Sequence, residues 1–105
     1  MKTSELSGAA LDLAVAKIEY TNPVTIGSST LMVFKGVPFD YHPSTDWEQG
    51  GPIIEREAIS VWARGDEWAA ESFVPNKQGR EEIGPTPLIA AMRCYVASVT
   101  EENEV

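Results

Sequence analysis

The residues with the greatest chemical capacity lie in one polar segment, positions 41–57. This segment combines aromatic rings, hydroxyls, an amide, carboxylates and an arginine with two adjacent glycines. A site for a small polar ligand needs aromatic faces, a few directed hydrogen bonds and a close approach of the backbone. We therefore predict a ligand site here, with Trp62 and Arg93 as further stacking and charged groups. The predicted ligand-binding residues are Tyr41, Ser44, Thr45, Asp46, Trp47, Gly50, Gly51, Glu55, Arg56, Trp62 and Arg93.

A structural explanation of the same residues stays open. Trp47 can fill the core, and the polar side chains around it can satisfy loop backbone groups that have no partners in a helix or sheet. Trp62 and Trp68 fall on strands expected to face each other, where aromatic pairing across the strands is a sufficient reason for both. An arginine inside a helix, such as Arg93, more often pairs with an acid than with a ligand.

Residues for catalysis are few. His42 is the only histidine, and the only cysteine, Cys94, lies in an apolar helical segment where a buried, inert thiol is the usual explanation. Close carboxylate pairs occur between 40 and 57, but sixteen acids in 105 residues produce such pairs by chance. Gly50-Gly51 lacks the lysine of a phosphate-binding loop. We predict no enzyme, no cofactor and no metal site.

Composition and charge exclude several classes of protein. Sixteen acidic against eight basic residues give a net charge of −8, which repels a phosphate backbone, so we predict no binding to duplex nucleic acid. No apolar run approaches the roughly 20 residues that cross a bilayer, and the start of the chain does not have the pattern of a signal peptide. The single cysteine excludes an intramolecular disulfide. We expect a cytoplasmic protein without membrane contact.

Helices are predicted near both ends of the chain. Apolar residues recur at helical spacing between positions 11 and 18, with Asp12 outside the apolar stripe, and Pro23 lies beyond the end of this helix. Thr86 and Pro87 are residue types that favour the N-cap and the first position of a helix, which we expect to continue over 88–99.

Two β-hairpins are predicted between these helices. Runs of β-forming residues at 24–26 and 31–34 make the first hairpin, and runs at 58–63 and 68–73 make the second around a tight reversal. The intervening stretch is predicted to be a long ordered loop with one helical turn. Thr45 and Glu48 have the spacing of a capping box for that turn, Gly50-Gly51 would end it, and 53–57 would form a second short turn.

The order of elements predicts an α+β protein. We expect a two-layer domain in which the N-terminal and C-terminal helices pack on a small antiparallel sheet of two hairpins. The whole chain, 1–105, is one domain's worth of sequence, and its acidic tail, about 100–105, is expected to fray. Because a thin two-layer domain leaves one sheet face to be covered, we also expect a homo-oligomer.

Three blocks of the sequence carry a family resemblance. They are residues 2–17, 44–57 and 84–98, and they span nearly the whole chain in the right order. With these blocks the sequence resembles the NinX-like family of phage proteins. It departs from the usual pattern at Leu13, where the family often has tryptophan, at Glu48, where it has alanine, and at Ala58, where it has glycine.

The resemblance implies a product of lambdoid-type phages or prophages in the bacterial host cytoplasm, from a family long described as a domain of unknown function. Small phage accessory proteins commonly act on host defences, replication or gene control by binding. We therefore expect a non-enzymatic counter-defence protein that sequesters a small polar or nucleotide-derived ligand. The alternative is an acidic inhibitor or adaptor that binds a host or phage protein.

Overall fold

The computed structural model describes residues 5–19, 24–26, 29–34, 37–72 and 81–99. The predicted helix-ending Pro23, residue 73 of the second hairpin and the acidic tail from 100 lie outside these ranges. The described elements, in chain order, are α1 (Gly8–Glu19), β1 (Val24–Ile26), β2 (Ser29–Phe34), β3 (Val37–Asp40), α2 (Trp47–Arg56), β4 (Ile59–Arg64), β5 (Glu67–Ser72), β6 (Glu82–Gly84) and α3 (Pro87–Val99).

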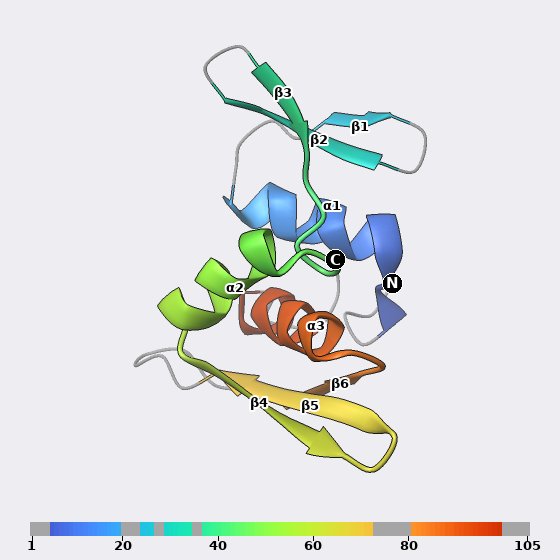
Figure 1. Ribbon diagram of the computed structural model, residues 1–105, viewed down its shortest axis with the longest axis vertical. Helices are drawn as coiled ribbons and strands as arrows, with labels where there is room; N and C mark the ends of the chain where they lie inside the picture. The colour runs from blue at the N-terminus through green and yellow to red at the C-terminus, as the bar shows by residue number, and fades with distance from the viewer. Residues whose placement is uncertain (1–4, 20–23, 27–28, 35–36, 73–80, 100–105) are drawn as a thin grey trace.

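The strands form two antiparallel sheets, in the orders β1-β2-β3 and β4-β5-β6. Figure 1 shows the helices between them: α1 lies against the first sheet, α3 lies across the second, and the two helices pack on each other. The α+β class, with N-terminal and C-terminal helices packed on a sheet, is confirmed. Each expected hairpin gains a third strand in a sheet of its own, because β3 and β6 are too short to show a periodicity in sequence.

Helix α3 forms the centre of the molecule. It contacts all three strands of the second sheet as well as α1 and α2. The hydroxyl of Thr86 accepts a hydrogen bond from the amide of Ile89 at 3.1 Å, so the predicted N-cap is confirmed. A Cβ on Gly84 would lie 2.7 Å from the backbone nitrogen of Ala90, which is why β6 needs glycine to approach the helix so closely.

Helix α1 is buried on more sides than its apolar stripe indicates. Leu11 and Val15 are fully buried, as expected, but Asp12 is buried as well. The prediction that Asp12 lies apart from the buried face was wrong, because α1 is covered both by α3 and by the first sheet. A helix between two neighbours buries a wider arc than one amphipathic stripe.

Helix α2 was predicted incorrectly as two short turns separated by glycines. It runs continuously through Gly50-Gly51-Pro52, and its N-cap is Asp46, whose side chain accepts from the amide of Glu48 at 2.9 Å. The Thr45 hydroxyl instead donates to the carbonyl of His42. Burial of Gly50 and Ile53 against the core offsets a propensity cost of about 1 kcal/mol per helical glycine.

The second hairpin turns at Gly65, whose φ of 63° confirms the predicted tight reversal. Its register pairs Trp62 with Ala69 and Trp68 with Ala63. Since neighbouring residues of a strand point to opposite faces, the two tryptophans do not pair across the strands as predicted. Trp68 packs on the core, and Trp62 lies on the outer face of the sheet.

Candidate functional site

A cleft opens where the N-terminal ends of α2 and α3 meet. Its volume is about 230 Å³. Residues before α2 and in its first turn form one side, and the first residues of α3 with its N-cap form the other. The lining residues are Ser44, Thr45, Trp47, Thr86, Pro87 and Leu88. Two segments 40 or so positions apart in sequence therefore share one concave surface, which is where small ligands usually bind.

Ser44 is the most unusual polar residue of the cleft. Only 1% of the residue is exposed, and its amide donates to Oδ1 of Asp12 at 3.0 Å. Its Oγ makes no hydrogen bond to any of the described residues. A buried hydroxyl without a partner costs free energy, roughly 1–3 kcal/mol, and therefore calls for an explanation. Ser44 also lines the cleft, but almost none of the Oγ surface is accessible, so a ligand atom would become its partner only after a small shift of this side chain.

The first turns of both helices add backbone donors. The first four amides of an α-helix lack intrahelical acceptors, and caps satisfy only some of them. Asp46 accepts from the amide of Glu48, and Thr86 accepts from that of Ile89. Within the described structure this leaves the amides of Trp47 and Leu88, and both of these residues line the cleft. Such amides, with the helix dipole behind them, attract atoms that carry negative charge or lone pairs.

Trp47 presents a large aromatic face beside these donors. The residue is 57% exposed, so it does not fill the core as the structural explanation supposed. An exposed tryptophan next to hydrogen-bond donors can hold a planar ring by stacking. The cleft thus combines an aromatic face with several directed donors, which are complementary to a flat, polar molecule.

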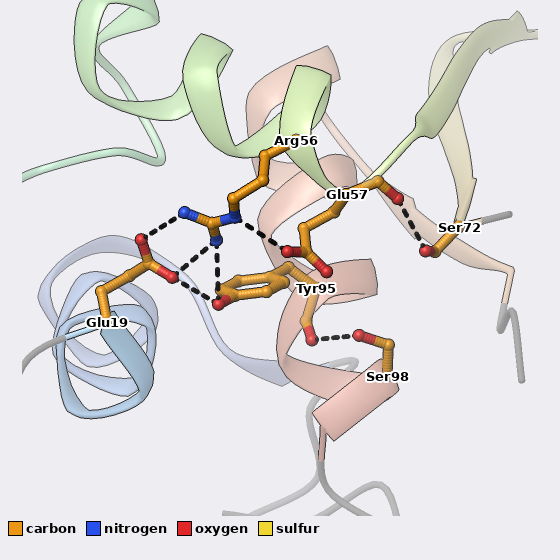
Figure 2. A network of polar contacts seen from close by, with 6 residues as sticks. All are labelled: Glu19, Arg56, Glu57, Ser72, Tyr95 and Ser98. Atoms are coloured by element: carbon orange, nitrogen blue, oxygen red, sulfur yellow. Dashed lines mark hydrogen bonds and ion pairs between the residues drawn. The ribbon is translucent and has the colours of Figure 1, made fainter. Parts of the chain in front are cut away.

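Arg56 lies at the opposite end of α2 from the cleft. Its guanidinium contacts Glu19 Oε2 at 2.7 Å, Glu57 Oε2 at 2.8 Å and the Tyr95 hydroxyl at 3.2 Å, and Figure 2 shows how these contacts join α1, α2 and α3. The Tyr95 hydroxyl in turn donates to Glu19. Ser72 extends the connection to β5 by donating to the carbonyl of Glu57.

The charges of this cluster are stabilised by one another. Hydrogen bonds to Glu19 and Glu57 raise the pKa of Arg56 above its ordinary value. Burial by itself would raise the pKa of Glu19, but hydrogen bonds from Arg56 and Tyr95 outweigh burial and lower it. Burial, followed by the hydrogen bond to Glu19, raises the pKa of Tyr95. The cluster therefore holds an ionised Glu19 and Arg56 and a neutral Tyr95 at neutral pH.

The remaining predicted site residues lie away from the cleft. Arg93 donates to the carbonyls of Leu6 and Ile83, both at 2.7 Å, so it pairs with backbone oxygens and ties the N-terminal segment to β6. Of the eleven predicted residues, the structure brings Ser44, Thr45 and Trp47 to the cleft, with Asp46 and Gly50 supporting it. The other six lie elsewhere. Tyr41 is in the core, Gly51 is on the partly exposed side of α2, and Glu55 is on the surface. Trp62 is on the outer sheet face, and Arg56 and Arg93 make the contacts described above.

The comparison with protein families gives the biological setting. Residues 2–99 match the family model of NinX from bacteriophage P22, which covers every described element. The chain belongs to the NinX family. It is therefore a phage accessory protein. A comparison with curated proteins found no match. None of the described helices of this NinX domain is long and apolar enough to cross a membrane.

Cys94 and the acidic groups of the NinX domain offer little for catalysis in the described ranges. Cys94 is buried, and burial raises the pKa of its thiol to about 12. A thiol with so high a pKa is protonated at neutral pH and is a poor nucleophile. In the part of the chain that the structure describes, no three His, Cys, Asp or Glu residues gather in a group that could hold a metal ion.

Asp12 is the functional residue that sequence patterns missed. Its carboxylate holds the amide of Ser44 across 32 residues of chain, so it positions the segment that begins the cleft. The available signal was a single acid in an otherwise apolar stretch of the helix, since residues 9–16 contain no other charge. A buried acid of this kind is retained only when it has partners.

We expect Asp12→Ala to destabilise the NinX domain by about 1–2 kcal/mol, because the buried amide of Ser44 would lose its acceptor. Asp12→Asn keeps an oxygen at the same position and is expected to restore most of this loss. Urea unfolding of both variants measures the difference. Equal stability of Asp12→Ala and the unchanged protein would show that the Ser44 amide finds another acceptor.

Proposed function

We propose that this NinX-family protein binds a small polar, nucleotide-derived ligand in the cleft between the N-termini of α2 and α3. Removing such a molecule from solution would serve the phage as counter-defence against a host signal. The observation that supports the proposal most directly is the buried Ser44 hydroxyl, which has no partner among the described residues. The exposed Trp47 and the amide of Leu88 lie around the same cleft.

Binding without chemical conversion is the mode that the lining favours. Its six residues contribute hydroxyls, backbone amides, an indole and apolar carbons, but no histidine, cysteine or carboxylate. General acid–base catalysis requires a titratable group within hydrogen-bond reach of the reacting atoms. The proposed activity is therefore sequestration, in which the ligand is released unchanged when the protein unfolds.

Native mass spectrometry tests the proposal. The protein is purified from bacterial lysate and then incubated with a panel of mono-, di- and cyclic nucleotides, so that bound mass and subunit stoichiometry are read together. We expect one retained small molecule per cleft, with its mass unchanged on release. A ligand-free protein with the lysate and with every member of the panel would contradict the proposal.

Two variants connect any retained molecule to the cleft. Ser44→Ala is expected to weaken binding by about tenfold while leaving stability unchanged or slightly increased, since it removes a buried hydroxyl that has no partner. Trp47→Ala is expected to weaken binding by roughly five- to hundredfold through lost stacking. The matched control is Trp62→Ala, which removes the other exposed tryptophan, far from the cleft on the outer sheet face. Affinity that falls equally in the control would place the site elsewhere.

The outer face of the second sheet favours one further function, binding of a basic host or phage protein. Trp62 is 37% exposed there and lies opposite Ala69, which pairs with Ile83 on β6. Glu67 and Glu71 fall on the same face and would attract basic side chains. A salt-sensitive partner captured from host lysate, and lost with Trp62→Ala but kept with Trp47→Ala, would favour this function over sequestration.

A further inference from the structure

The size of the cleft limits how much of a ligand it can enclose. Its volume of about 230 Å³ is below the roughly 300–1,000 Å³ of pockets that surround a drug-sized molecule. A single planar ring with its substituents fits this space, whereas a dinucleotide would extend well beyond it. Recognition must therefore act on one part of a nucleotide-like ligand.

The cleft offers several donors and one hydroxyl that can only accept, because Thr45 Oγ1 already donates its hydrogen to the carbonyl of His42. The amides of Trp47 and Leu88 can only donate, and the Ser44 hydroxyl has no partner among the described residues. Thr86 Oγ1 already accepts from the amide of Ile89, which leaves its own hydrogen to donate. A ligand that satisfies this set brings acceptor atoms, such as carbonyl oxygens or ring nitrogens.

Among the residues that the structure describes, none with a full positive charge lines the cleft. Arg56 is paired with Glu19 and Glu57, and Arg93 donates to backbone carbonyls. The remaining described cations, Lys17 and Arg64, are also not among the lining residues. The charged groups next to the lining in sequence are the acids Asp46 and Glu48, and Glu48 is exposed in the first turn of α2.

This balance of charge disfavours a phosphate inside the cleft. Each helix N-terminus carries the equivalent of about half a positive charge, and Asp46 already offsets the end of α2. A phosphate of nearly two negative charges would lie close to the acids Asp46 and Glu48, with no lysine or arginine of the described ranges in the lining to compensate it. A neutral ring with partial negative charge on its acceptors avoids that cost.

We infer that the cleft recognises the neutral, planar heteroaromatic ring of its ligand, as in a nucleobase, and leaves any phosphate in solvent. The ring stacks on Trp47, and its acceptor atoms meet the Ser44 hydroxyl and the free amides of the two helix N-termini. The inference rests on the proposed function, since it takes this cleft as the ligand site. It also specifies which part of the ligand the protein recognises.

Isothermal titration calorimetry with matched pairs tests this inference. Each of the common nucleosides is compared with its own 5′-monophosphate on the full chain, at about 0.05 M and about 0.5 M salt. For the base that binds, we expect the two dissociation constants to agree within about threefold, with little change with salt. Trp47→Ala is expected to weaken both members of the pair by the same factor, roughly five- to hundredfold, and Trp62→Ala to weaken neither.

The remaining outcomes distinguish a failure of this inference from a failure of the proposed function. Binding that needs a phosphate, in a mononucleotide or a cyclic nucleotide, and that weakens steeply with salt would overturn the inference while leaving sequestration in place. No binding of any nucleoside or nucleotide, with nothing retained from lysate, would overturn both.

Discussion

Replacing Gly50 by alanine is expected to destabilise the protein by about 3 kcal/mol, at the upper end of the usual cost of overpacking. The added Cβ would lie 2.4 Å from the carbonyl oxygen of Pro43 and 2.7 Å from Cδ2 of Leu88. Leu88 can adjust its side chain, but Pro43 meets the methyl group with backbone. Urea unfolding at neutral pH measures the loss.

Gly51→Ala is the matched control for this prediction. It is the next residue of the same helix, and a Cβ there would meet nothing within 4 Å. Since alanine favours a helix over glycine, we expect this variant to be more stable by about 0.5–1 kcal/mol. If alanine changed stability equally at both positions, α2 would not be pressed against Pro43 and Leu88 as closely as the structure has it.

Arg56→Met is expected to lower the free energy of unfolding by about 2–3 kcal/mol at neutral pH. The side chains of Glu19 and Glu57 are only 15% and 11% exposed, and both would lose their cation. Removing one partner of a buried ion pair costs roughly 3–5 kcal/mol, which we reduce because Arg56 itself is half exposed. Arg64→Met is the control: its pair with Glu81 is exposed on both sides, so we expect a change within about 0.5 kcal/mol.

The pH dependence of this effect has a definite sign. Burial tends to raise the pKa of Glu19, but hydrogen bonds from Arg56 and Tyr95 lower it below its ordinary value. The stability that the ionised carboxylate contributes is therefore present above the pKa of the unfolded chain and is lost as the pH falls through the lower pKa of the folded protein. The difference in stability between the unchanged protein and Arg56→Met should narrow from about pH 7 to about pH 3. A difference that stayed constant would show that packing of the arginine stem, and not charge, accounts for the loss.

The two end helices could be predicted from sequence because local chemistry determines them. Apolar residues at helical spacing mark α1 and α3, and Thr86-Pro87 marks the start of α3 before any tertiary contact is known. The hairpins at 24–34 and 59–72 follow from β-forming runs around short turns in the same way. Each of these signals lies within a few residues of the structure that it predicts.

Helix α2 could not be predicted because tertiary packing decides it. Gly50, Gly51 and Pro52 all disfavour a helix locally, yet the chain continues to Arg56 to bury Ile53. The connection between α2 and β4 likewise has a backbone conformation that its residue type does not favour. Ala58 adopts a φ of 51°, a left-handed conformation that suits glycine, the residue that the family resemblance places here.

The candidate site was predictable in one half only. Ser44, Thr45 and Trp47 belong to the polar segment singled out from sequence, and their exposure or burial is now known. Thr86, Pro87 and Leu88 were recognised as a helix start but not as part of a site. Their approach to Ser44 depends on the contact between Gly50 and Leu88, which no local pattern encodes.

The central place of α3 also determines when during synthesis the chain can fold. This helix is the last described element, yet it contacts every strand of the second sheet and the first helix. The hydrogen bond from Arg93 to Leu6 closes a span of 87 residues. Before α3 is synthesised, α1 can pack only on the first sheet, and the β4–β6 sheet lacks the helix that covers its inner face. We therefore expect the packing of α1 and of the second sheet to be completed only after α3 has been synthesised.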